Sequence, residues 1–152
     1  MATRLPHEYE AFLEWVGAGP ATATAGLRPP IEVGPPPEFG GDAAHWSPEH
    51  LLLSALNGCL QATFAAITQA QHLPVKRYGS VARATLARAD QGVGFTSFDL
   101  SLTVVGDAED EERLRAAVLL AKQRCFVAGA LRLPVQLNLT FEPATAAAPV
   151  GS

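Results

Sequence analysis

The sequence predicts an α+β domain in which an antiparallel sheet packs on a long buried central helix, with a second helix closer to the C-terminus. Residues 45–73 repeat apolar side chains at helical spacing and carry no Asp, Glu, Lys or Arg after Glu49. Residues 96–105 and 135–141 instead alternate apolar and polar side chains, as half-buried strands do. Strands that come in runs, interrupted by only two helices, are typical of the α+β class.

The N-terminal third is expected to be mostly extended. Residues 8–16 alternate polar and apolar side chains like a strand, although their apolar residues also fit a helical face. Residues 17–26 are rich in Gly, Ala and Thr and can hold a turn and a second short strand. Prolines flank residues 31–33, which confines that segment to an edge strand or an extended loop.

The central helix has a clear start. Ser47 can cap the first free backbone N–H groups, Pro48 suits the first helical position, and the helix dipole favours Glu49 in the first turn. The expected buried face consists of Leu51, Leu52, Ala55, Leu56, Cys59, Leu60, Thr63, Phe64 and Ile67. A surface helix carries charges on its outer face, so this uncharged helix is expected to be covered on nearly all sides. Its polar side chains would be costly in lipid, so a membrane span is not expected.

A hairpin is expected after the central helix, because residues 89–92 resemble a turn between two strand segments, residues 78–88 and 96–105. The acidic segment 107–112 suits a helix N-terminus, where the helix dipole stabilises negative charge. We prefer this interpretation of the segment to a metal-binding site. The second helix should follow and end near Cys125. Its apolar positions are Leu114, Val118, Leu119 and Ala121.

Length and composition indicate one globular domain. The chain has 152 residues, of which 48% are apolar and 17% charged. We expect a single domain over residues 8–142, a flexible terminus over residues 1–7 and a disordered, Ala- and Pro-rich tail over residues 143–152. The net charge of −4 gives no reason to expect nucleic acid or an anionic membrane as a partner. Two cysteines without a signal peptide favour a cytoplasmic protein, in which a transient disulfide is more typical than a permanent one.

Two motifs of the central helix resemble the OsmC/Ohr family, the osmotically inducible and organic hydroperoxide resistance proteins. These motifs are Trp46-Ser47-Pro48-Glu49-His50-Leu51-Leu52 and Ala55-Leu56-Asn57-Gly58-Cys59-Leu60. In that family a Pro-Glu-x-Leu helix start precedes a peroxide-reactive cysteine, and a second cysteine follows at the end of another helix. The resemblance extends from about Tyr9 to Phe141 and implies the family's intertwined homodimer, with its sites at the subunit interface.

The resemblance implies a thiol-dependent peroxidase. Cys59 would attack the peroxide as a thiolate and become a sulfenic acid, and Cys125 would condense with it to a disulfide. An external dithiol would then reduce this disulfide, and the family suggests a dihydrolipoyl protein. The apolar surroundings expected for Cys59 favour organic hydroperoxides over hydrogen peroxide. The cycle requires neither a metal nor another cofactor.

A buried thiol in the middle of a helix needs a nearby cation to ionise. In the family an Arg of the first hairpin supplies this cation, held in place by the Glu of the Pro-Glu motif, which is Glu49 here. The corresponding residues 17–20 contain no Arg. The sequence offers Arg28 as a substitute, and Arg124, next to Cys125, as another.

Two other functions stay open. Without the hairpin Arg, the chain could be a redox-sensing or small-molecule-binding module that lacks efficient peroxide turnover. It could also be a structural dimer whose cysteines are inert core residues. His50 lies out of phase with Cys59 on the helix, so a Cys–His nucleophile pair is not expected. His45 and His50 lack further ligands at metal-binding spacing.

Overall fold

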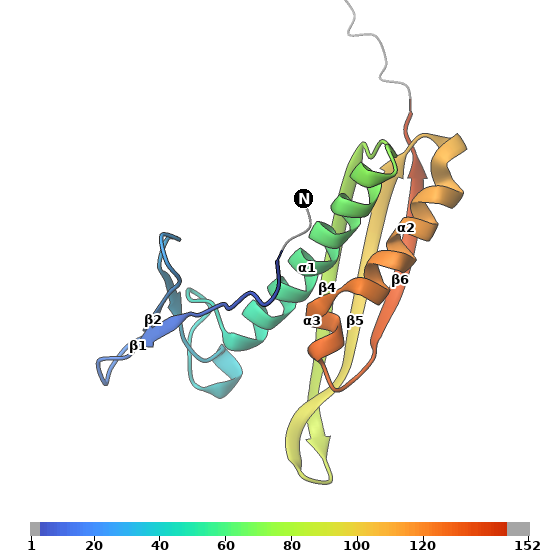
Figure 1. Cartoon of the computed structure of the whole chain (residues 1–152). Helices are drawn as coiled ribbons and strands as arrows, with labels where there is room; N and C mark the ends of the chain where they lie inside the picture. The colour runs from blue at the N-terminus through green and yellow to red at the C-terminus, as the bar shows by residue number, and fades with distance from the viewer. Residues whose placement is uncertain (1–3, 146–152) are drawn as a thin grey trace, which may run out of the picture. The chain divides into compact units, whose positions relative to one another are not determined.

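The computed structural model describes residues 4–145, and the chain divides into two compact units, residues 1–52 and residues 53–152 (Figure 1). The N-terminal unit contains an antiparallel sheet in the order β1-β2-β3. Its strands are β1 (Phe12–Glu14), β2 (Ala21–Thr24) and β3 (Ile31–Val33), followed by the 3-10 helix η1 (Pro37–Phe39). The extended N-terminal third is therefore confirmed, and β3 is an edge strand, as its flanking prolines favour.

The N-terminal sheet has almost no core of its own. Phe12 and Leu13 pair with β2, yet their side chains are 59% and 64% exposed. Trp15, just beyond β1, is 62% exposed, and its indole N–H donates to the carbonyl of Gly19 at 3.1 Å. Strands this short, with this little apolar burial, are not stable on their own. The sheet therefore needs a further surface to pack on.

The C-terminal unit is built on a sheet in the order β4-β5-β6. Its strands are β4 (Arg77–Ala89), β5 (Gly92–Gly106) and β6 (Val135–Pro143). The predicted hairpin is confirmed, because β4 and β5 pair antiparallel across a turn at Asp90 and Gln91. The expected antiparallel pairing does not extend to β6, which runs parallel to β5. The chain between these two strands passes through helices, and such a crossover connection brings the next strand back in the same direction.

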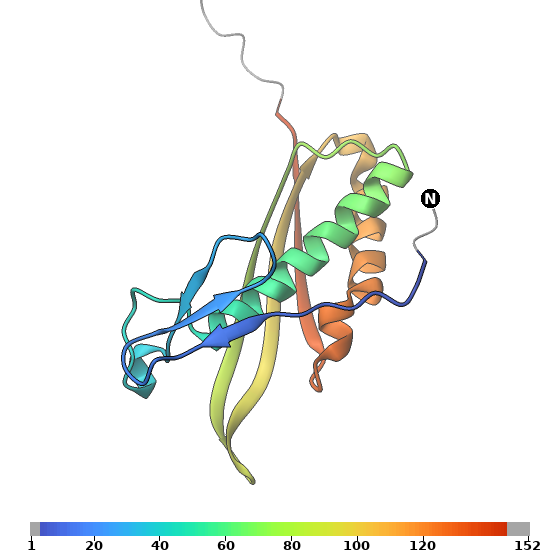
Figure 2. The ribbon, with the colours of Figure 1, turned by 60° about the vertical axis from the view of Figure 1, so that its left-hand side comes forward.

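One face of this sheet carries the core. On β5, the side chains of Phe98, Leu100, Leu102 and Val104 are at most 3% exposed, whereas the residues between them are only half-buried. Two helices, α1 (Pro48–Ala70) and α2 (Glu111–Arg124), lie along the sheet in both views (Figures 1 and 2). The predicted alternation of β5 is thus confirmed and shows which face the helices cover.

Local hydrogen bonds explain where α1 begins and ends. The predicted cap is present, because Ser47 Oγ accepts a hydrogen bond from the backbone N–H of His50 at 3.2 Å. At the C-terminal end, His72 takes a left-handed φ of 50°. The N–H of Leu73 donates to the carbonyl of Thr68 at 2.9 Å, which is the long-range bond of a Schellman ending.

Only one stripe of α1 is buried within this chain. The buried residues are Leu56, Leu60, Phe64, Ile67 and Thr68. Cys59 and Thr63 are half-buried and Ala55 is exposed. The sequence predicts a helix that is covered on nearly all sides, and the described part of one chain does not provide that cover. By length and hydropathy alone α1 could cross a membrane, a test that core helices of soluble proteins also pass.

The second helical segment follows the prediction in most respects. After η2 (Ala108–Asp110), α2 begins with the acidic residues Glu111 and Glu112. Arg113 pairs with Asp110 of η2, and Arg115 pairs with Glu111 within the helix. Its buried residues are Leu114, Ala117, Val118 and Ala121. Leu119, the remaining apolar position that the sequence analysis named, is 55% exposed, because it lies out of phase with the buried stripe.

Near the C-terminus, the structure contains a short helix and a longer last strand than the sequence predicts. The short helix α3 (Phe126–Ala130), which follows α2 after Cys125, was not predicted. β6 reaches Pro143, the first residue of the expected tail. Residues 1–3 and 146–152, which make up much of the two expected flexible ends, lie outside the described residues.

The burial pattern of α2 predicts unequal effects of two matched substitutions. Leu114→Ala should lower the free energy of unfolding by about 2–5 kcal/mol, because it leaves a cavity at a side chain that is 0% exposed. Leu119→Ala should change it by less than about 1 kcal/mol, because that side chain is largely in solvent. Urea unfolding followed by circular dichroism measures both values. Equal losses would contradict the assigned orientation of α2.

Candidate functional site

The two cysteines lie on different helical elements of the C-terminal unit. Cys59 is in the middle of α1 and is half-buried, whereas Cys125 lies between α2 and α3 and is 3% exposed. Cys125 ends α2 because its backbone turns to the extended region, with φ −71° and ψ 112°. Its sulfur then caps α3 by accepting a hydrogen bond from the N–H of Ala128 at 3.5 Å. This cap fixes the direction of the Cys125 side chain.

The fold brings the two thiols together, although they are far apart in the sequence. Burial raises the pKa of Cys125 above its usual value, the N–H of Ala128 partly offsets this effect, and Cys59 raises the pKa further, as a hydrogen-bond partner and as a charge. Both cysteines are free thiols. At neutral pH Cys125 is therefore a protonated thiol beside Cys59, a geometry in which one sulfur can attack the other.

A polar group of side chains lies next to this pair, between α1 and β4. Ser80 Oγ donates a hydrogen bond to Asn57 Oδ1 at 2.9 Å. The ring of Tyr78 packs on Phe64, with 5.4 Å between the ring centroids. Burial raises the pKa of Tyr78, the Ser80 hydroxyl offsets part of this effect, and Cys125 adds to the increase. The sequence analysis missed this group, although its signal was present as polar residues at alternate positions of β4.

The Pro-Glu motif at the start of α1 leaves one acceptor unpaired. Glu49 is half-buried, and its Oε2 atom is fully buried without a hydrogen-bond partner among the described residues. His50 lies 2.7 Å from Ser47, measured from Nδ1 to Oγ, and so belongs to the helix cap. A buried carboxylate oxygen without a donor is costly, which makes Glu49 a position where a cationic group would be stabilising.

The two candidate cations lie in exposed positions. Arg28 follows β2 in a turn, and its guanidinium donates a hydrogen bond to the carbonyl of Ala25 at 3.3 Å. No ion pair joins Arg28 to Glu49 within the described chain. Arg124 is the last residue of α2 and is also exposed. The structure therefore brings Cys59 and Cys125 together, whereas both arginines lie at exposed positions.

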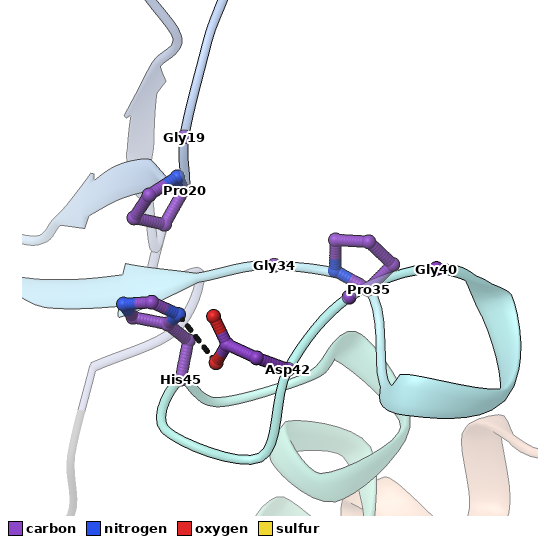
Figure 3. Close-up of a pocket in the computed structure, with 8 residues that line it drawn as sticks. Gly19, Pro20, Gly34, Pro35, Gly40, Asp42 and His45 are labelled. Atoms are coloured by element: carbon purple, nitrogen blue, oxygen red, sulfur yellow. Dashed lines mark ion pairs between the residues drawn. The ribbon is translucent and has the colours of Figure 1, made fainter.

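A separate cavity of about 360 Å³ lies within the N-terminal unit (Figure 3). It is lined mainly by glycine and proline, with His45 and Asp42 facing each other at 2.9 Å from Nδ1 to Oδ1. Glu32 Oε2 lies 3.4 Å from the other ring nitrogen of His45. Hydrogen bonds from backbone N–H groups, led by that of Ala44, lower the pKa of Asp42. Within residues 4–145, no group of three or more His, Cys, Asp or Glu side chains could hold a metal ion.

Solved structures with the same fold come from several bacteria. An OsmC-like protein of unknown function from Vibrio cholerae matches with a TM-score of 0.80 and 20% identity, over 88% of this chain and 99% of that one. An organic hydroperoxide resistance protein from Elizabethkingia anophelis matches with a TM-score of 0.72 and 18% identity, over 93% and 100%. The organic hydroperoxide resistance protein OhrB of Bacillus subtilis matches with a TM-score of 0.62 and 17% identity, over 90% of this chain and 98% of that one. No curated protein sequence matches the chain.

The family follows from the sequence itself as well as from the fold. A family model described as OsmC-like protein matches residues 40–140, which include the start of α1 and both cysteines. This match spans well over half of the chain, and the solved structures share its α+β arrangement. The chain therefore belongs to the OsmC-like protein family.

Proposed function

We propose that this protein is a thiol-dependent peroxidase that reduces organic hydroperoxides. The observation that carries this proposal is the proximity of Cys59 and Cys125 in the reduced protein. Structurally similar proteins from Elizabethkingia anophelis and Bacillus subtilis are named organic hydroperoxide resistance proteins. A pair of adjacent thiols on one chain is the minimum that an intramolecular peroxide-reducing cycle needs.

The proposed cycle has three steps. The Cys59 thiolate attacks one peroxide oxygen, the O–O bond breaks, and the products are Cys59 sulfenic acid and an alkoxide that takes up a proton to become an alcohol. The Cys125 thiolate attacks the Cys59 sulfur, which forms the disulfide and releases water after protonation. A dithiol, for which we propose a dihydrolipoyl protein, reduces the disulfide by thiol exchange. We propose a cytoplasmic location, where a transient disulfide of this kind is more typical than a permanent one.

We assign the activation of Cys59 to a cation held by Glu49, with Arg28 as that cation. The unpaired Oε2 atom of Glu49 is an acceptor for a guanidinium. Arg28 makes only a long hydrogen bond to a backbone carbonyl in an exposed turn, so it can be recruited at small cost. The second candidate is a redox-sensing module in which no cation activates Cys59 and peroxide turnover is slow. It is supported by the fact that Glu49 Oε2 has no cationic partner among the described residues.

We further propose that the working unit is a homodimer. Only one stripe of α1 is buried in this chain, although the helix carries no charge after Glu49. Large apolar side chains of the N-terminal unit are also exposed, among them Phe12, Leu13 and Trp15. Apolar surface of this kind on two elements is typical of an obligate interface.

Peroxide treatment followed by peptide mass spectrometry tests the peroxidase proposal. One equivalent of cumene hydroperoxide should convert the reduced protein to a Cys59–Cys125 disulfide within seconds. In Cys125→Ser the sulfenic acid should accumulate on Cys59, where dimedone traps it, and Cys59→Ser should consume no peroxide. Arg28→Ala should slow the first step about tenfold, because a nearby cation stabilises the thiolate that attacks the peroxide.

Arg88→Ala is the matched control, because Arg88 is an exposed residue near the end of β4. Two unreacted thiols after several minutes would rule out the peroxidase and leave the redox-sensing or binding module. Equal rates for wild type and Arg28→Ala would remove Arg28 from the site while leaving the cycle intact.

Sedimentation equilibrium of the full chain tests the dimer. The expected species has twice the 16.0 kDa mass of one chain across the micromolar range. Trp15→Glu should weaken the association, because it places a charge on an apolar surface, whereas Arg88→Ala should not. A monomer at all concentrations would contradict the proposed interface.

A further inference from the structure

Tyr78 carries a hydrogen-bond donor for which the proposed cycle has not yet accounted. Its hydroxyl oxygen is fully buried and has no hydrogen-bond partner among the described residues. The ring is held by Phe64 on one side, so the hydroxyl is not free to swing into solvent. A buried hydroxyl without a partner lowers stability, and such groups in native proteins call for an explanation.

The position of Tyr78 places this donor beside the resolving cysteine. Tyr78 and Ser80 lie on the face of β4 that α1 covers, and the Ser80–Asn57 hydrogen bond ties this part of the strand to the helix. The Ser80 hydroxyl donates to Asn57. It lies close enough to lower the pKa of Tyr78, yet the phenol hydroxyl makes no hydrogen bond of good geometry in the described chain. Cys125 is near enough to raise the pKa of Tyr78, so the phenol and the thiol form one cluster.

The second step of the cycle needs a donor at this place. Cys125 must lose its proton to attack Cys59, yet burial and Cys59 both raise the pKa of its thiol. Its sulfur accepts a long hydrogen bond of 3.5 Å from Ala128 N–H, and this bond and the Val127 N–H offset only part of the increase. The side chains of β5 and β6 on this face are apolar; on α2, Arg124 is exposed and Lys122 is half-buried.

We propose that the Tyr78 hydroxyl donates a hydrogen bond to the Cys125 thiolate while the disulfide closes. The inference rests on the proposed peroxidase cycle and adds a residue that acts on its second step alone. Cys125 gives its proton to solvent, and its sulfur attacks the sulfur of the Cys59 sulfenic acid. The S–S bond forms, the S–O bond breaks, and the departing hydroxide takes up a proton to become water. Tyr78 keeps its own proton throughout.

Rapid-quench mass spectrometry of Tyr78→Phe separates the two steps. The variant retains the ring that packs on Phe64, so the fold should be kept, and near-ultraviolet circular dichroism checks this. Sulfenic acid should form on Cys59 at the wild-type rate. Closure of the disulfide should be about tenfold slower at pH 7, with its pH profile moved up by about one unit, because a hydrogen bond to a charged sulfur is lost.

Tyr9→Phe is the matched control, since Tyr9 is the second tyrosine of the chain and is 91% exposed. It should leave both steps unchanged. Closure in Tyr78→Phe at the wild-type rate and pH profile would overturn the inference, even if the peroxidase cycle itself is established.

A second measurement does not depend on peroxide chemistry. In the Cys59→Ser background, alkylation of Cys125 as a function of pH gives the midpoint of its ionisation. Adding Tyr78→Phe should raise this midpoint by about one pH unit. An unchanged or lower midpoint would show that Tyr78 does not stabilise the thiolate. If wild type forms no sulfenic acid, the proposed function fails, while this titration still decides the role of Tyr78.

Discussion

The packing of one stripe of α1 against the C-terminal sheet determines where the chemistry of this protein can occur. Leu56, Leu60 and Phe64 are almost fully buried, and this contact sets the rotation of the helix. Because Cys59 lies between two of these residues in sequence, the same rotation leaves it at the margin of the buried stripe. A helix turned by a quarter would bury Cys59 in the sheet or expose it to solvent, away from Cys125. The site is thus a consequence of core packing rather than of a flexible loop.

The two thiols differ because their surroundings differ. Cys59 projects from an uninterrupted helix, whereas Cys125 is at a junction between two helices and is almost completely excluded from water. Burial and the neighbouring sulfur both keep Cys125 protonated, which suits a residue that acts second. In the proposed cycle, Cys59 would be the more accessible nucleophile and Cys125 the protected resolving thiol. This arrangement also gives a reason for the role that we propose for the buried hydroxyl of Tyr78, since a buried thiolate needs donors that water cannot supply.

The sequence predicted the fold well where local patterns decide the structure. The alternation of β5, the cap at Ser47 and the turn after β4 depend on neighbouring residues and are all confirmed. The parallel pairing of β6, the helix α3 and the exposure of Leu119 depend on tertiary arrangement, which no short pattern records. Family membership followed from the motif at the start of α1. The Tyr78 cluster did not, because an inward-facing tyrosine looks like a core residue until its hydroxyl is seen to lack a partner.

The account depends most on the closeness of Cys59 and Cys125 in the native chain. Oxidation of the reduced protein with diamide, followed by peptide mapping, tests that closeness without any peroxide or enzyme partner. We expect one disulfide within the chain, between Cys59 and Cys125. It should form much faster in the folded protein than in protein unfolded by concentrated urea. Disulfides only between chains, or a rate that unfolding leaves unchanged, would show that the fold does not bring the two thiols together.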